Sequence, residues 1–235
     1  MSEMIYRTEI ELFNSYFDMN DRLTAKSILN IFQDVASRHA EDIGLGFETM
    51  VKKNLYWVIS RIKFDILKQP EVNQKVIVET WPHEKGRIDF DRDMCISSED
   101  GEVLIIATSK WCVIDAMTRS LQRTDGVEYV GEIHSRKNYE GKFGKILVPD
   151  KEKVEIYTHR VKFADLDHNK HMNNTNYASI ILNAIENKNF SHFEINFVSE
   201  SRLEEEIKVC RIEENGEEYI IGENNENISF IGFVK

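Results

Sequence analysis

The polar side chains best placed to do chemistry lie in residues 165–177, between a predicted strand and a predicted helix. Carboxylate, amide and imidazole groups recur there at close spacing, as Asp167, Asn169, His171, Asn173 and Asn174. The first turn of a helix offers unpaired backbone N–H groups and the positive end of the helix dipole. A carbonyl oxygen placed there would be polarised beside an acid and an imidazole. The segment therefore indicates chemistry on an acyl group, with Asn173 or Asn174 as the helix cap.

A purely local role is the alternative for this segment. Asp, Asn and His favour turns and helix caps because their side chains hydrogen-bond to nearby backbone groups. An isolated Asp-x-Asn pair is more typical of a turn than of a site. The complete pattern Asp167-x-Asn169-x-His171-x-Asn173-Asn174, followed by an apolar helix, is rarer and favours a functional site.

Two predicted helices follow polar segments of this kind. After residue 173, Tyr177, Ile180 and Ile181 recur at helical spacing. Near the start of the chain, Thr24 can cap a helix with an apolar stripe that ends before Gly44.

Alternating or β-branched runs predict antiparallel strands on either side of these helices. The predicted strands are 6–12, 58–66, 75–81, 88–96, 103–114, 154–163, 192–198, 206–212, 217–221 and 228–234. Asn215-Gly216 predicts a two-residue hairpin. Arg92 lies on an otherwise apolar strand face, which predicts a buried ion pair with a carboxylate.

The order of elements occurs twice. Residues 18–23 (Asp-Met-Asn-Asp-Arg-Leu) align with residues 167–172 (Asp-His-Asn-Lys-His-Met), and each stretch precedes a predicted helix. The first copy has Arg22 where the second has His171. A duplicated unit, with chemistry kept in the second copy, explains this pattern. The fold class is therefore α+β, with a helix against an antiparallel sheet in each copy.

The pattern around Asp167, Asn169 and His171 resembles the acyl-acyl-carrier-protein thioesterases of plants and bacteria, the FatA/FatB-like group. A second block in the other half of the chain agrees with this resemblance. It consists of Glu79-Thr80-Trp81-Pro82, Arg92-Asp93, Gly101-Glu102, Ala107-Thr108-Ser109-Lys110-Trp111 and Thr118-Arg119.

The resemblance implies two fused hotdog domains, each a long helix wrapped by a curved antiparallel sheet. We expect an N-terminal domain at 1–124 with the acyl-chain pocket, a linker at 125–150 and a catalytic domain at 151–235. Phe32, Val35, Trp57 and Trp111 are the predicted pocket residues. Plain core packing is the alternative for each of them.

The resemblance assigns catalysis to Asp167, Asn169 and His171, together with a glutamate that corresponds to Glu200. Plant members usually have a cysteine after that glutamate, and here the residue is Ser201. We therefore expect hydrolysis by a water molecule that Glu200 or Asp167 activates as general base. His171 and Asn169 would orient the water or stabilise the oxyanion, and amides near Asn174 would bind the thioester oxygen. Ser201 would be a nucleophile only if a base reaches it.

No cofactor is expected. His168 and His171 are three residues apart, but they precede the helix and lack a clear third ligand, so no metal is expected either. The three cysteines, Cys95, Cys112 and Cys210, lie far apart in apolar runs and are interpreted as buried thiols.

The formal net charge of −11 excludes nucleic acid as a general partner. The resemblance implies acyl carrier protein as partner. Because this carrier is acidic, it would need a local basic patch, for which the candidates are Lys52, Lys53, Arg136, Lys137, Lys142 and Lys145. No apolar run is long enough to cross a membrane and no signal peptide is evident, so we expect a cytoplasmic monomer or homodimer.

The predicted function is hydrolysis of fatty acyl-acyl carrier protein, which releases the free fatty acid and ends elongation. The alternatives are a hotdog enoyl-CoA hydratase, an acyl-CoA thioesterase and a non-catalytic acyl-binding module. The hydratases typically have Asn-Pro-x-His, whereas here Lys170 follows Asn169. A regulatory module would need an output domain, and no DNA-binding segment is present.

Overall fold

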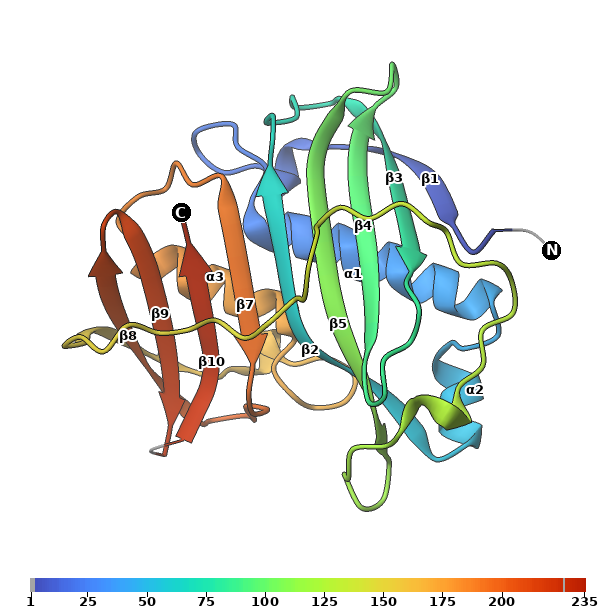
Figure 1. Cartoon of the computed structure of the whole chain (residues 1–235). Helices are drawn as coiled ribbons and strands as arrows, with labels where there is room; N and C mark the ends of the chain where they lie inside the picture. The colour runs from blue at the N-terminus through green and yellow to red at the C-terminus, as the bar shows by residue number, and fades with distance from the viewer. Residues whose placement is uncertain (1–2, 226) are drawn as a thin grey trace. The chain divides into compact units, whose positions relative to one another are not determined.

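The computed structural model describes residues 3–225 and 227–235. Contacts between residues divide the chain into two compact units. The first unit contains Met1–Thr24 and Asn30–Phe143, and the second contains Ala25–Leu29 and Gly144–Lys235. Each unit is built on one antiparallel sheet (Figure 1).

The sheet of the first unit has the strand order β1-β3-β4-β5-β2. All neighbouring strands are antiparallel, as the alternating sequence patterns predict. The strands are β1 (Tyr6–Glu11), β2 (Leu55–Ile66), β3 (Lys75–Pro82), β4 (Phe90–Ser98) and β5 (Val103–Asp115).

The long helix α1 (Ala25–Asp42) runs across one face of this sheet (Figure 1). Its apolar stripe is buried, including Phe32 and Val35. The chain leaves the helix through Gly44, whose φ of 72° is accessible to glycine at low cost. The predicted helix and its stop are thus confirmed.

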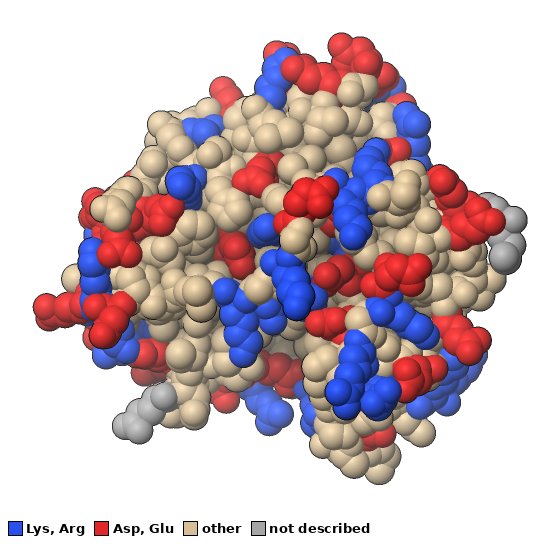
Figure 2. All heavy atoms as spheres, in the orientation of Figure 1, with Lys and Arg blue, Asp and Glu red and all other residues tan. Residues whose placement is uncertain are grey.

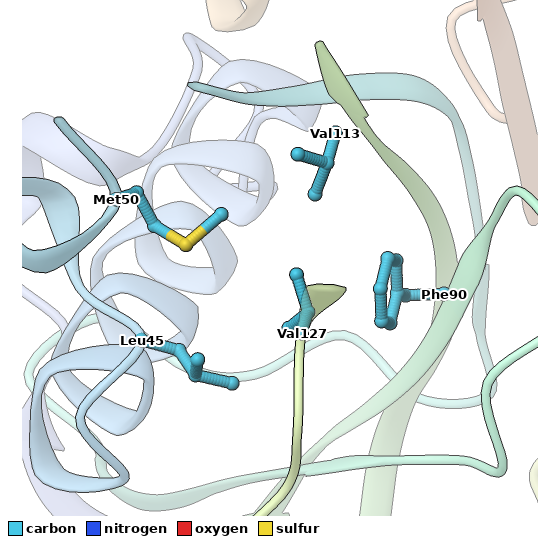
Figure 3. Close-up of a cluster of buried hydrophobic side chains, with 5 residues drawn as sticks. All are labelled: Leu45, Met50, Phe90, Val113 and Val127. Carbon is cyan, nitrogen blue, oxygen red and sulfur yellow. The ribbon is translucent and has the colours of Figure 1, made fainter. Parts of the chain in front are cut away.

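A short helix, α2 (Phe47–Lys52), follows α1 and was not predicted. Met50 of α2 contributes to a buried apolar cluster (Figure 3). The cluster consists of Leu45, Met50, Phe90, Val113 and Val127. A helix of one and a half turns carries little periodicity of its own and depends on such tertiary contacts.

Residues 136–139, part of the predicted linker, lie across β4 and β5 (Figure 1). The Asn138 side chain donates hydrogen bonds to the carbonyls of Met94 and Ala107, at 2.7 and 2.9 Å. The Trp81 indole donates to the Arg136 carbonyl at 2.7 Å. Apart from the 3₁₀ turn η2 (Thr124–Gly126), the described chain between β5 and β6 forms no helix or strand. This segment is nevertheless fixed to the first unit by side-chain hydrogen bonds.

The predicted carboxylate partner of Arg92 is wrong. The guanidinium is buried, and its Nη1 lies 2.9 Å from His39 Nδ1 and 3.0 Å from Thr80 Oγ1. Within residues 3–225 and 227–235, no carboxylate lies within ion-pair distance of Arg92. Strand alternation placed Arg92 on the inner face, but it could not show that helix α1 brings an imidazole there.

The second unit repeats the same connectivity, with the strand order β6-β8-β9-β10-β7. Its elements are β6 (Val154–Arg160), the 3₁₀ turn η3 (Phe163–Asp165), α3 (Asn174–Ala184), β7 (His192–Phe197), β8 (Glu206–Glu214), β9 (Glu217–Asn224) and β10 (Asn227–Val234). Asn215 and Gly216 have φ of 53° and 81°, the positive values of a type I′ turn, so the predicted hairpin is confirmed. The α+β class, with a helix and an antiparallel sheet in each copy, is also confirmed.

Candidate active site

The carboxylate of Asp167 organises the turn that precedes α3. Its Oδ1 accepts hydrogen bonds from the backbone N–H groups of Asn169 and His171, at 2.8 and 3.4 Å. The Asp167 N–H in turn donates to the His171 carbonyl at 2.9 Å, and Lys170 takes a positive φ of 64°. This is a side-chain-stabilised turn of the kind that Asp favours. It fixes the backbone of His171 relative to the start of the helix.

The first unit contains the same turn. Asp18 Oδ1 accepts from the N–H groups of Asn20 and Arg22 at 2.8 and 3.1 Å, and the Asp18 N–H donates to the Arg22 carbonyl at 2.9 Å. Asp21 has a φ of 54°, close to that of Lys170. The predicted repeat is therefore confirmed at the level of individual hydrogen bonds. Because the turn persists in the copy without the histidine, Asp at this position has a structural role in both.

Asn173 caps helix α3. Its side-chain oxygen accepts from the Thr175 N–H at 3.0 Å and from the Thr175 hydroxyl at 3.1 Å. The Asn176 N–H donates to the Asn173 carbonyl at 2.9 Å. For the Asn174 N–H, no acceptor exists within the described residues. One unpaired amide therefore remains at the positive end of the helix, where the sequence predicts an oxyanion donor.

His171 and Glu200 lie together, as predicted from their separate segments. His171 Nε2 is 3.3 Å from Glu200 Oε2, and the two side chains are 21% and 37% exposed. The loop that carries Glu200 is joined to the turn, because the Met172 N–H donates to the Ser201 carbonyl at 2.8 Å. An isolated antiparallel β-bridge between the backbones of His171 and Arg202 extends this pairing. The pair is thus accessible to water and positioned by backbone on both sides.

Asn169 and Ser201 have different surroundings. Asn169 is exposed, and its side-chain amide makes no hydrogen bond within the described part of the chain. Ser201 is fully buried, and its hydroxyl lies 2.9 Å from that of Ser229. Cys210 is buried in β8, and burial raises the pKa of its thiol.

The predicted pocket residues all belong to the first unit. Phe32 and Val35 are buried on α1, whereas Trp57 and Trp111 are partly buried against the cluster of Figure 3. The edge of the Trp57 ring meets Phe90, with 4.9 Å between centroids. The structure therefore brings the two tryptophans to one cluster, which does not include Phe32 or Val35.

Ser229 and Tyr177 were not predicted as part of the site. Tyr177 was interpreted as the end of the polar segment and as an apolar position on the helix face, without a role in the site, and nothing in the strand sequence around Ser229 indicates one. No group of three His, Cys, Asp or Glu side chains in residues 3–225 and 227–235 has the arrangement of a metal site. The same residues contain no helix with the length and apolar character needed to span a membrane.

The fold and the turn before α3 together define a double-hotdog protein with a polar site at the start of that helix. The chain belongs to the acyl-ACP thioesterase family. The model of the acyl-ACP thioesterase N-terminal domain matches residues 3–129, and that of the C-terminal domain matches residues 148–229. The polar turn and Glu200 both fall within the second match.

The chain is similar to relatives from plants and bacteria. It is 35% identical to the chloroplastic oleoyl-acyl carrier protein thioesterase 2 of Arabidopsis thaliana, over 71% of this chain and 50% of the relative. The chain thus spans about half the length of the curated relatives it matches. The crystal structure of an acyl-ACP thioesterase from Bacteroides thetaiotaomicron superposes with a TM-score of 0.90 and 26% identity, covering 98% of this chain and 97% of that one. The 12:0-ACP thioesterase from Umbellularia californica has the same fold, with a TM-score of 0.84, 18% identity and coverage of 100% and 98%.

Proposed function

We propose that the protein hydrolyses the thioester of fatty acyl-acyl carrier protein, releasing a free fatty acid and the carrier thiol. The observation that carries this proposal is the His171–Glu200 pair, at 3.3 Å, with His171 three residues before the unpaired Asn174 N–H that begins α3. A carboxylate base, an imidazole and an amide donor are groups that can promote hydrolysis of an acyl group by water. The names of the relatives supply the substrate class.

In the proposed mechanism, Glu200 takes a proton from a water molecule whose oxygen adds to the thioester carbonyl carbon. His171 orients this water and Glu200 through its Nε2. The carbonyl oxygen becomes an oxyanion, which the Asn174 N–H stabilises. The carbon–sulfur bond then breaks, and the departing sulfur receives the proton held by Glu200. The products are the fatty acid and the free thiol.

Glu200 is the proposed base in preference to Asp167. One carboxylate oxygen of Asp167 already accepts two backbone N–H groups. Asp18 makes the same two contacts in the copy that has no histidine. We therefore assign Asp167 to shaping the turn and Glu200 to proton transfer.

Replacement of Glu200 by Gln tests the base. The variant keeps the size of the side chain but removes its basicity, so we expect kcat to fall by about a hundredfold or more, the range of general base catalysis. Glu204→Gln is the matched control, because Glu204 lies in the same loop but pairs with Arg160 and Lys162 instead. Free thiol released from acyl-acyl carrier protein is the measurement.

Four results would overturn parts of this proposal. Full activity in Glu200→Gln would remove the base assignment. A covalent acyl-enzyme in a single turnover would replace direct attack by water with a nucleophilic mechanism. Loss of enoyl absorbance without thiol release would indicate a hydratase, and faster turnover of acyl-CoA than of acyl-acyl carrier protein would change the proposed partner.

A further inference from the structure

Strand β10 contains a β-bulge at Ser229. The pairing of β10 with β9 shifts register between Ile228 and Phe230, so Ser229 is the extra residue. A bulge turns a residue out of the regular ladder and often occurs beside an active site. Here the Ser229 carbonyl accepts the N–H groups of Val198 and Ser199, at 2.9 and 3.0 Å. The backbone of the bulge therefore binds the beginning of the loop that carries Glu200.

The side chain of Ser229 contacts both neighbours of Glu200. Its hydroxyl donates to the Ser199 carbonyl at 3.3 Å and lies 2.9 Å from the Ser201 hydroxyl. Either hydroxyl of this serine pair can be the donor to the other. Both serines are fully buried. Such hydrogen bonds hold a loop firmly, since breaking one leaves a buried polar atom unpaired.

Tyr177 connects this pair to helix α3. Its ring is buried between the edges of Phe197 and Phe230, with centroid distances of 5.6 and 5.3 Å. Burial raises the pKa of the Tyr177 phenol, and hydrogen bonds from the Ser201 and Ser229 side chains partly offset the rise. The Tyr177 ring thus packs against Phe230, the residue after Ser229, and against Phe197, which pairs with Phe230 between β7 and β10.

We propose that Ser229, Ser201 and Tyr177 form a buried hydroxyl clamp that positions Glu200 against His171. This inference rests on the proposed function, in which Glu200 is the base. Glu200 is partly exposed on a loop, so its position depends on how the residues on either side of it are held. The clamp holds Ser199 and Ser201 at one point, the bulge of β10. It also gives Ser201 a positioning role in place of a nucleophilic one, because its hydroxyl is fully buried against that of Ser229.

Removal of single hydroxyls tests the clamp. We expect Ser229→Ala and Ser201→Ala each to lower kcat about tenfold, the effect of losing one buried hydrogen bond, with KM changed less than about twofold. Tyr177→Phe should act in the same direction. Tyr157→Phe is the matched control, since the Tyr157 hydroxyl donates to the Ile180 carbonyl of the same helix but takes no part in the clamp. Wild-type kcat in all three clamp variants would overturn the proposal.

The same substitution made in the Glu200→Gln variant distinguishes an effect on the position of Glu200 from a general disruption of the structure. In Glu200→Gln, the base is already absent, so adding Ser229→Ala should leave the residual kcat unchanged. A further tenfold loss there would mean that Ser229 does not act through Glu200 and would overturn the proposal. If Ser229→Ala does not fold, the same comparison is made with Tyr177→Phe.

Hydrogen exchange provides a readout that does not need the proposed substrate. We expect the amides of Val198 and Ser199 to exchange at least about tenfold faster in Ser229→Ala than in wild type, because the clamp no longer closes the loop. Unchanged exchange would overturn the clamp. If the wild-type protein releases no thiol but this exchange quickens, the proposed function fails while the clamp stands.

Discussion

At the scale of single residues, the buried Arg92–His39 pair leads us to expect that the free energy of unfolding depends on pH. Arg92 Nη1 can donate to His39 Nδ1 only while that nitrogen is unprotonated. Burial, and secondarily the charge of Arg92, lowers the pKa of His39 to about 4 from its ordinary 6.5. Burial also lowers the pKa of Arg92, to about 10, so the guanidinium stays charged at neutral pH.

The sign of the pH effect follows from proton binding. Between pH 6.5 and 4 the unfolded chain binds a proton at His39 that the folded protein does not, so stability falls as the pH falls through this window. We expect His39 to account for about 2 kcal/mol of lost unfolding free energy between pH 7.5 and 5. Urea unfolding of wild type and His39→Gln at both pH values measures this, because the difference between the two proteins isolates His39. Parallel pH dependences would contradict the prediction.

Single residues also show what the sequence can and cannot reveal. The proximity of His171 and Glu200 could be predicted because the resemblance to the thioesterase family singles out both residues. The role of Ser229 could not, since it depends on a bulge that adds one residue to a strand and has no sequence signal. The partner of Arg92 was missed because it comes from a helix that lies 53 residues earlier in the chain.

At the scale of elements, the repeated turn before α1 and α3 predicts matched effects in the two units. Asp18 and Asp167 each accept two backbone N–H groups in turns of equal geometry. We expect Asp18→Ala and Asp167→Ala each to lower the unfolding free energy by about 1–2 kcal/mol, because two amides lose their acceptor. Replacement of either aspartate by Asn keeps an acceptor oxygen, so these variants should retain most of the unfolding free energy. Denaturant unfolding of the four variants is the measurement, and a large loss for Asp167→Ala alone would refute structural equivalence.

Long elements could be predicted and short ones could not. The apolar stripe of α1 and the alternation of β2 and β4 extend over enough residues to show their period, and β5 was recognised as a long run that is apolar on both faces. Helix α2 and the 3₁₀ turn η3 contain six and three residues, and tertiary contacts determine them. Strand β6 ends at Arg160, three residues before the predicted end, because the chain enters η3 instead.

At the scale of the whole molecule, charge affects how the proposed carrier protein approaches. The chain has a formal net charge of −11, and acidic and basic side chains are interspersed on the face drawn in Figure 2. Among the predicted basic residues, Arg136 pairs with Glu79 at 2.9 Å and lies over the Trp81 ring, so it is engaged within the first unit. Lys52 and Lys53 are exposed at the end of α2.

We therefore expect salt to assist the reaction with an acidic carrier. Raising the ionic strength from about 0.01 to about 0.15 M shortens the Debye length from about 30 to about 8 Å, which screens the repulsion between two acidic proteins. The kcat/KM for acyl-acyl carrier protein should rise severalfold, whereas an uncharged short thioester should show no change. A fall with salt would instead demonstrate that a local basic patch attracts the carrier.

The duplicated turn has arginine in the first copy and histidine in the second, so only the second copy supplies an imidazole at this position. Under the proposed function, substitutions in the interior of the first unit leave the His171–Glu200 pair of the second unit intact. A laboratory evolution experiment can use this separation. If the first unit holds the acyl chain, as we propose, a library confined to the side chains of Figure 3 would change which acyl chains are released, and a library confined to the β10 bulge would change the turnover number.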